Sequence, residues 1–142
     1  VIRVKRILII NGPNLNLLGK REPVLYGSVS FEDFLEVLRS EYSSIELDYI
    51  QENGEEELIN AVQKGSQYDA VIFNPAAFSH TSMAVADAVA AIDTPVIEVH
   101  ISNIFARDAN RYHSHVSKYA AAIVVGAGLD GYRMAVGQVF RF

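Results

Sequence analysis

Cysteine is missing from this chain of 142 residues. Its absence excludes disulfide bonds, catalysis by a thiolate and any metal site built on cysteine ligands. We therefore expect a cytoplasmic protein. Half of the residues are hydrophobic and a fifth are charged, which is the composition of an ordinary globular chain. The length fits a single domain over residues 1–142.

Long apolar segments and an excess of positive charge are missing as well. No apolar run approaches the length that crosses a bilayer, so we expect no membrane partner. Basic residues near the start are not followed by a long apolar segment with a cleavage site, which argues against a signal peptide. The formal net charge of −5 argues against a nucleic-acid partner. A small anionic substrate held by a few arginines remains possible.

Several motifs of catalysis and cofactor binding are absent. There is no GxSxG nucleophile motif, and Ser79 beside His80 is better explained by local capping than by a catalytic triad. No GxGxxG or P-loop motif follows a predicted strand. Pro13 stands in the first turn, where a flavin phosphate would need glycine and hydroxyl groups. The histidines show no HxxxH or HExxH spacing, so we predict no metal site.

What is present is an alternation of strand and helix patterns. Four strand patterns are mostly apolar, and the second one alternates as a half-exposed strand near a sheet edge does. The strand patterns are Ile7–Ile10, Ile45–Ile50, Ala70–Phe73, Pro95–Val99 and Ala121–Val125. Helical spacing is found in four segments, the first with a Ser-x-x-Asp capping pattern and the second with Asn as its expected cap. These segments are Ser30–Ser44, Asn53–Gly65, Val85–Ile92 and Tyr132–Phe140.

This alternation predicts an α/β fold with a five-stranded parallel sheet and helices on both faces. In the flavodoxin-like strand order 2-1-3-4-5, ligands bind beyond the carboxyl ends of the strands, near the first and the third. The first, third and fourth strands are neighbours in that order, so the polar residues that follow them would meet at one rim. These residues are Asn14 to Tyr26, then Asn74, Ser79 and His80, then His100, Ser102, Arg107 and Arg111.

The connection after the first strand carries specific polar groups. About a dozen residues separate the turn Asn11–Asn14 from the next helix, which is long for such a connection. Loops of this length in compact domains are often functional, and we interpret residues 19–27 as a lid over the site. A phenol is a poor base at neutral pH, but a nearby guanidinium favours the phenolate. Arg21 or Arg111 could make Tyr26 a base in this way.

A histidine and a glutamate share one side of the fourth strand. Because residues i and i+2 of a strand face the same way, Glu98 can orient His100 and favour its protonated form, as a general acid requires. The alternative is a histidine that merely satisfies its hydrogen bonds at a strand end. His80 lies near a predicted helix start, where the helix dipole disfavours an imidazolium, so a neutral hydrogen-bonding role suits it better.

Five segments carry a resemblance to a known family. They are NGPNLNLLGKREPVLYG at 11–27, NPAAFSHTS at 74–82, EVHISN at 98–103, AR at 106–107 and VVGAGLDGYRMA at 124–135. With these motifs in this order, the chain resembles the type II 3-dehydroquinases (3-dehydroquinate dehydratases of the shikimate pathway) over nearly its whole length. The resemblance implies removal of water from 3-dehydroquinate to give 3-dehydroshikimate, by anti elimination through an enolate. It implies no metal or organic cofactor, and a homo-oligomer that is a dodecamer built as a tetramer of trimers.

The resemblance also implies roles for single residues in the chemical steps. Tyr26 would abstract the proton beside the ketone as a phenolate, with Arg21 lowering its pKa. Asn14 would help to stabilise the enolate with a bound water. His100 would protonate the departing hydroxyl, oriented by Glu98.

A second group of residues would bind the substrate. Asn74 would hold His100 and the substrate together, and Ile101 and Ser102 would bind the carboxylate. His80 and Arg111 would bind ring hydroxyls. Asp87 would reach toward a neighbouring subunit's site. Arg107 is expected at the lid or at a subunit contact.

Three positions depart from the family pattern. Ala76 stands where glycine is usual, so a positive φ at this residue would add strain. Ala86 replaces a common arginine, and Asn110 replaces an aromatic or apolar residue. We expect the last two to affect subunit packing more than chemistry.

Two other functions compete with this reading. A catalytically silent relative would bind a shikimate-like ligand without turning it over, although Tyr26, Arg21 and His100 are all present. A flavin-binding module of the same fold would give a yellow protein, whereas the dehydratase would be colourless.

Overall fold

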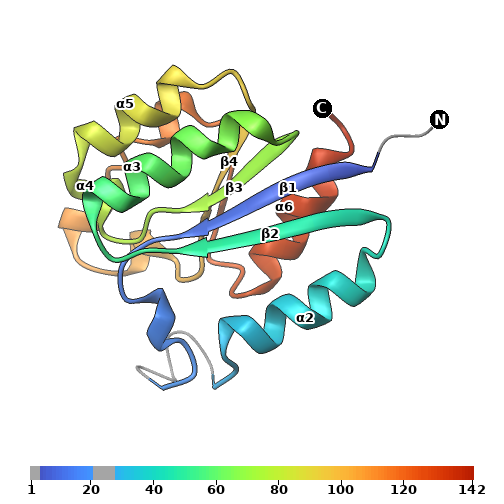
Figure 1. The fold of residues 1–142 in the computed structure, drawn as a ribbon. Helices are drawn as coiled ribbons and strands as arrows, with labels where there is room; N and C mark the ends of the chain where they lie inside the picture. Colours follow the sequence, from blue (N-terminus) through green and yellow to red (C-terminus); the bar gives the residue numbers. More distant parts are fainter. Residues whose placement is uncertain (1–3, 21–27) are drawn as a thin grey trace.

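The computed structural model describes residues 4–20 and 28–142. They contain one five-stranded sheet in the order β2-β1-β3-β4-β5, in which every pair of neighbours is parallel (Figure 1). The strands are β1 (Lys5–Asn11), β2 (Ile45–Gln51), β3 (Ala70–Asn74), β4 (Val96–His100) and β5 (Ala122–Val125). This is the predicted fold class and strand order.

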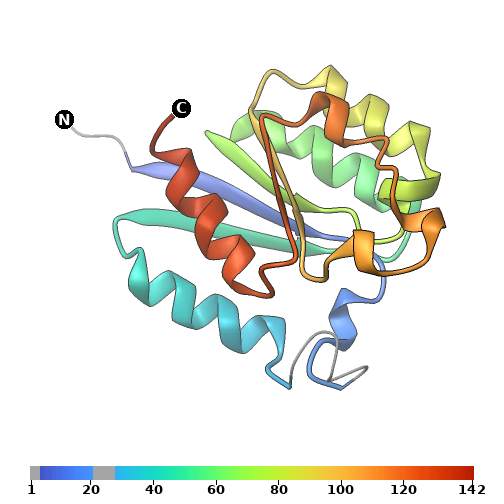
Figure 2. The ribbon, with the colours of Figure 1, turned by 180° about the vertical axis from the view of Figure 1, so that it is seen from behind.

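Helices cover both faces of the sheet, as Figures 1 and 2 show from opposite sides. α2 (Phe31–Glu41) and α6 (Asp130–Val139) lie on one face. α3 (Glu55–Lys64) and α5 (Met83–Ala91) lie on the other, and the short α4 (Phe78–Thr81) precedes α5. Among the described residues, no helix is long and apolar enough to cross a membrane.

The apolar run of β1 is continuous because both sides of this strand are buried. Ile7 and Ile9 pack into the cluster under α2 and α6, whereas Leu8 and Ile10 pack into the cluster under α3 and α5. All four side chains are 0% exposed. Alternate side chains of a strand point to opposite faces, so a strand between two helical layers must be apolar at every position.

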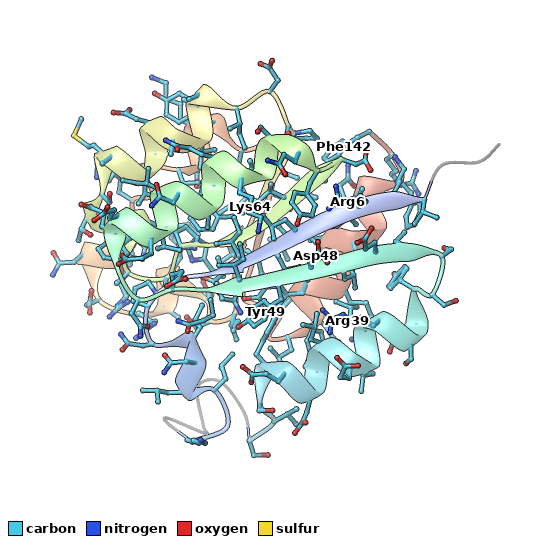
Figure 3. The ribbon with its side chains drawn as sticks, viewed as in Figure 1. Arg6, Arg39, Asp48, Tyr49, Lys64 and Phe142 are labelled. Carbon is cyan, nitrogen blue, oxygen red and sulfur yellow. The ribbon has the colours of Figure 1, made fainter. Side chains whose placement is uncertain are left out.

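The sequence of β2 alternates between apolar and polar residues because this strand lies at the edge of the sheet and is only partly covered. Figure 3 shows Arg6 of β1 beside Asp48 of β2, and their Nη2 and Oδ2 atoms are 3.7 Å apart. Tyr49, the next residue, turns to the α2 side and packs its ring 4.8 Å from that of Phe31. Charge on one side of an edge strand also protects it from pairing with another chain.

One predicted helix start agrees with the structure and two differ from it. Ser30 caps α2, with its Oγ accepting from Asp33 N at 3.1 Å, as the capping pattern predicted. Ser82 caps α5, so this helix begins two residues before the predicted Val85. The prediction of Asn53 as a cap was wrong, because Gly54 is the N-cap of α3. Asn53 Oδ1 instead accepts from Asn14 N at 3.0 Å, which ties down the loop after β1.

Ala76 adopts the left-handed backbone conformation, with φ 54°. This is the strained position that the usual glycine would relieve. The turn lets Ala76 N donate to Asn74 Oδ1 at 3.0 Å, and it leads the chain from β3 into α4. A left-handed alanine costs about 1–2 kcal/mol.

The variant Ala76→Gly should therefore be more stable. The relief of strain exceeds the extra entropy that glycine gives the unfolded chain, about 0.5–1 kcal/mol. We expect the free energy of unfolding in urea to rise by about 0.5 kcal/mol. Ala77→Gly is the matched control, because Ala77 has an ordinary helical φ of −63°; it should lower stability. A loss of stability in both variants would contradict strain at Ala76.

Candidate active site

The carboxyl ends of β1, β3 and β4 meet at one rim of the sheet. Asn11 of β1 is paired with Asn74 of β3, and β4 runs beside β3 and ends at His100. Gly12 N donates to Asn74 O at 2.8 Å, and a Cβ on Gly12 would lie 2.6 Å from Pro75 O. The connections after β1 and β3 therefore touch where they leave the sheet. This close approach of the two backbones requires glycine at position 12.

A cavity of about 100 Å³ opens at this rim, several times the space that one water needs. The loops after β1, β3 and β4 all contribute to its wall, and Figures 1 and 2 show these segments on one side of the molecule. It gathers eight residues that the sequence placed at the rim. They are Asn14, Asn74, His80, His100, Ile101, Ser102, Arg107 and Arg111.

Two described residues that were predicted for the site, Glu98 and Asp87, do not line this cavity. Glu98 is 0% exposed and lies behind His100. Asp87 is exposed on α5 and lines a second cavity, formed with residues of the segment 113–119. Tyr26 and Arg21 lie outside the described residues, as does most of the predicted lid at 19–27.

Glu98 and His100 form a buried pair. His100 Nε2 and Glu98 Oε2 are 2.5 Å apart, and the side chain of His100 is 4% exposed. Burial raises the pKa of Glu98, but the hydrogen bonds from His100 and Ser117, the charge of His100 and the bond from Ser114 outweigh it, so the net pKa is lowered. The carboxylate form of Glu98 is therefore favoured.

His80 differs from His100 in its surroundings although the two rings stack, with centroids 6.0 Å apart. Its Nδ1 lies 2.8 Å from His113 O. A carbonyl only accepts, so Nδ1 carries the hydrogen and Nε2 of the neutral ring is an acceptor. The pKa of His80 is lowered, first by burial and then by the charges of His100 and Arg111, against the opposing effect of the His113 carbonyl. The neutral form agrees with the sequence analysis, but burial is its main cause, since α4 is only four residues long.

A neutral network holds the asparagines at the ends of β1 and β3. Tyr132 of α6 donates from its hydroxyl to Asn11 Oδ1 at 2.6 Å and accepts from Asn74 Nδ2 at 2.9 Å. Burial raises the pKa of Tyr132 and brings that of Tyr49 to about 12. Both phenols stay protonated at neutral pH, so neither of them suits the role of a base.

Cationic side chains form the outer wall of the cavity. Arg107 Nη1 donates to Ser102 Oγ at 3.4 Å, and Arg111 Nε lies 3.5 Å from Asp108 Oδ2. Both arginines line the cavity together with Ser102. Guanidinium groups beside a hydroxyl and backbone amides suit an anionic, hydroxylated ligand.

The sequence analysis missed three residues that support the site, namely Ser114, Ser117 and Tyr132. Ser114 Oγ and Ser117 Oγ donate to Glu98 at 2.8 and 2.6 Å. Their only signal is the pair of serines in HSHVS, downstream of the fourth strand. Tyr132 was assigned to the apolar face of the last helix, and nothing local reveals its buried hydroxyl contacts.

Among residues 4–20 and 28–142, no group of three or more His, Asp or Glu side chains is placed to hold a metal ion. The described groups of the site are two imidazoles, a carboxylate and two arginines. Together they can donate a proton and bind an anionic ligand.

The model of the family Dehydroquinase class II matches residues 5–140. The chain belongs to this family. A 3-dehydroquinate dehydratase of Actinobacillus pleuropneumoniae serotype 5b is 48% identical over 136 residues, which cover 94% of this chain and 88% of that protein. A 3-dehydroquinate dehydratase of Aliivibrio fischeri is 47% identical over 139 residues, covering 96% and 93%.

Solved structures agree with the class II dehydroquinase assignment. The type II dehydroquinase from Propionibacterium acnes matches this fold with a TM-score of 0.93 and 36% identity, over 100% of both chains. At this identity the likeness extends beyond the fold, and the family resemblance found in the motifs is confirmed.

Removing the hydroxyl of Tyr132 should destabilise this class II dehydroquinase. Tyr132→Phe removes the hydroxyl that Asn11 Oδ1 and Asn74 Nδ2 both bind, and leaves these two buried atoms without that hydrogen bond. The free energy of unfolding should fall by about 1–3 kcal/mol. Unfolding in urea measures the loss. Tyr49→Phe is the control, since its hydroxyl is 3.4 Å from Asn11 Nδ2 and the variant should lose less. Equal losses would contradict a central role of Tyr132.

Proposed function

We propose that this class II dehydroquinase removes water from 3-dehydroquinate by anti elimination through an enolate, giving 3-dehydroshikimate. The observation that carries the proposal is the buried Glu98–His100 pair in a cavity lined by two arginines. The names of the relatives, 3-dehydroquinate dehydratases at up to 48% identity, supply the substrate.

The base in this proposal is Tyr26, acting as a phenolate with Arg21 lowering its pKa. A proton beside a ketone is weakly acidic, so a strong base and a stabilised enolate are needed. The resemblance of residues 11–27 to the family motif supports the assignment. The raised pKa values of Tyr49 and Tyr132 support it too, because those buried phenols cannot serve instead.

The enolate oxygen receives hydrogen bonds from Asn14 and a bound water. Asn14 lines the cavity, and its backbone N donates to Asn53 Oδ1. Asn14 has φ 72°, a left-handed conformation that asparagine tolerates better than most residues. A donor held in advance where negative charge develops stabilises it without reorganisation.

The acid is His100. Glu98 binds its Nε2, which leaves Nδ1 to protonate the hydroxyl that departs from the carbon next to the deprotonated one. The enolate collapses, the carbon–oxygen bond breaks and a double bond conjugated with the ketone forms. The proton taken by Tyr26 and the proton given by His100 balance, and water is the leaving group.

The remaining cavity residues hold the substrate in this orientation. Asn74 contacts His100 and the substrate, Ile101 and Ser102 bind the carboxylate, and His80 and Arg111 bind ring hydroxyls. Support comes from their common position on the cavity wall. The neutral His80, with Nε2 as an acceptor, is suited to a hydroxyl donor.

Assembly into a dodecamer, as a tetramer of trimers, is also part of the proposal, with Asp87 reaching toward a neighbouring subunit's site. The exposure of Asp87 on α5, away from the cavity of its own chain, supports this role. Native mass spectrometry should give about twelve times the chain mass of 15.7 kDa. A monomer that is fully active would remove the role of Asp87. The cytoplasmic location expected from the sequence stays a prediction.

The decisive assay follows the absorbance of the conjugated enone after addition of 3-dehydroquinate. We expect the protein to be active, to remain active in EDTA, and to lose about 10²–10⁴-fold in kcat in Tyr26→Phe, the range typical of a lost general base. Tyr42→Phe is the matched control, since Tyr42 stacks on Phe140 away from the cavity, and it should keep its activity.

The outcomes separate the parts of the proposal. Unchanged turnover in Tyr26→Phe would remove this base but leave the reaction. No enone from the unsubstituted protein would remove the reaction, and a yellow preparation would point to a flavin module.

A further inference from the structure

The segment 113–117 binds His80 and Glu98, two residues that contact the ring of His100. His113 O binds His80 Nδ1 at 2.8 Å, and His115 N donates to Ser79 O at 2.8 Å. Val116, 0% exposed, anchors the segment in the core cluster of the α3 and α5 face. The backbone bonds to Ser79 and His80 and the buried side chain of Val116 therefore hold the segment in place, with its two serines against Glu98.

We propose that Ser114 and Ser117 are positioning residues, which hold Glu98 as an oriented carboxylate so that His100 can act as the acid. This inference rests on the proposed function for the role of His100. Neither serine lines the catalytic cavity, so both would act through Glu98 and not on the substrate.

The directions of the hydrogen bonds support this role. Ser117 Oγ donates to Glu98 Oε1 at 2.6 Å, while Ser114 Oγ donates to Glu98 Oε2 at 2.8 Å. Ser114 Oγ also accepts from Val116 N at 3.2 Å and from Ser117 N at 3.3 Å. The lone pairs of this hydroxyl are thus engaged by backbone donors, and its own hydrogen is left for Glu98.

A carboxylate is the form that accepts all of these bonds. With His100 on Oε2 as well, Glu98 accepts three hydrogen bonds from side chains, and it has no exposed surface through which water could replace them. A protonated carboxyl would place a second hydrogen against one of these donors. Burial favours the neutral acid, and the serines help to reverse that preference, in agreement with the lowered pKa of Glu98.

Replacing the serines leaves the other charged groups at this end of the sheet in place. His80 stacks on His100, and Arg107 and Arg111 line the cavity. His80 is bound through the backbone carbonyl of His113, which alanine at 114 or 117 leaves in place. The charge of Glu98 also raises the pKa of His80, so the titration of His80 responds both to the position of the segment and to the charge of Glu98.

The test compares Ser114→Ala, Ser117→Ala, the double variant and Ser117→Thr with the unsubstituted protein. Ser40→Ala is the matched control, because Ser40 Oγ donates to Val37 O on the exposed side of α2. The first readout is an infrared titration of the protonated carboxyl band of Glu98, assigned by its loss in Glu98→Gln. The second is the pH dependence of kcat with 3-dehydroquinate, and the third is an NMR titration of His80.

Loss of a hydrogen-bond donor destabilises the carboxylate of Glu98, so its pKa rises. Acidification then protonates Glu98, and abolishes activity, at a higher pH than in the unsubstituted protein. We expect the titration of Glu98 and the acid limb of kcat to move to higher pH in each alanine variant, and farthest in the double variant. On the acid side kcat should fall about tenfold for each lost bond to the charged group, with little change in KM. Ser117→Thr should restore the unsubstituted behaviour, and Ser40→Ala should not differ from it.

An unmoved Glu98 titration in the three alanine variants, with an unmoved His80, would overturn the inference. If the titration of His80 also shifts in the alanine variants, Ser117→Thr decides between the two causes. A Glu98 titration in Ser117→Thr like that of the unsubstituted protein supports the role of the hydroxyl, and one like that of Ser117→Ala rejects it. The infrared readout needs no turnover. An inactive unsubstituted protein would therefore refute the proposed function, while the response of Glu98 would still decide whether the serines hold the carboxylate.

Discussion

The hydrogen bond between Glu98 and His100 is the constraint on which the site depends. A carboxylate with no exposed surface is costly unless its oxygens are bound, and removing one partner of such a pair costs about 3–5 kcal/mol. The sequence around it meets this requirement. β4 continues to His100, which keeps both side chains on one face of the strand, and the segment 113–117 returns to supply two hydroxyl donors. The surroundings of this pair are thus built by two separate segments of the chain.

A neutral network stands beside this charged pair. Tyr132 joins Asn11 and Asn74 at the ends of β1 and β3, and burial keeps its phenol protonated. Proton transfer through these groups would require a charged phenolate or amide in an apolar place, which is unfavourable. Among the described residues of the cavity and its support, charge is therefore carried by Glu98 and by the arginines of the outer wall. That separation lets one cavity keep His80 neutral while its neighbour is paired with a carboxylate.

The features that the sequence predicted are those with a local cause. The buried run Ile7–Ile10 has apolar residues on both sides because two helical layers cover β1, and the pairing of Glu98 with His100 follows from the period of two along a strand. The missed features depend on contacts across the fold. Tyr132 lies 121 positions from Asn11, and an amphipathic helix pattern cannot reveal that its hydroxyl is needed there. Asn53 was predicted to cap a helix by the same kind of local reasoning, but its Oδ1 accepts a hydrogen bond from Asn14 N in the loop after β1.

Ala76 links strain to the geometry of the site. Its left-handed φ of 54° lets its backbone N–H bind Asn74 Oδ1, and the chain then enters α4 at once, where Ser79 Oγ donates to Ala76 O. His80 is four residues from this turn, so a relaxed backbone at Ala76 would swing its ring away from His100 and from the carbonyl of His113. The strain is retained because the bonds on both sides of the turn over-determine it, as is common where backbone strain occurs near functional groups. The position of His80 therefore depends on the turn at Ala76 as well as on its own contacts.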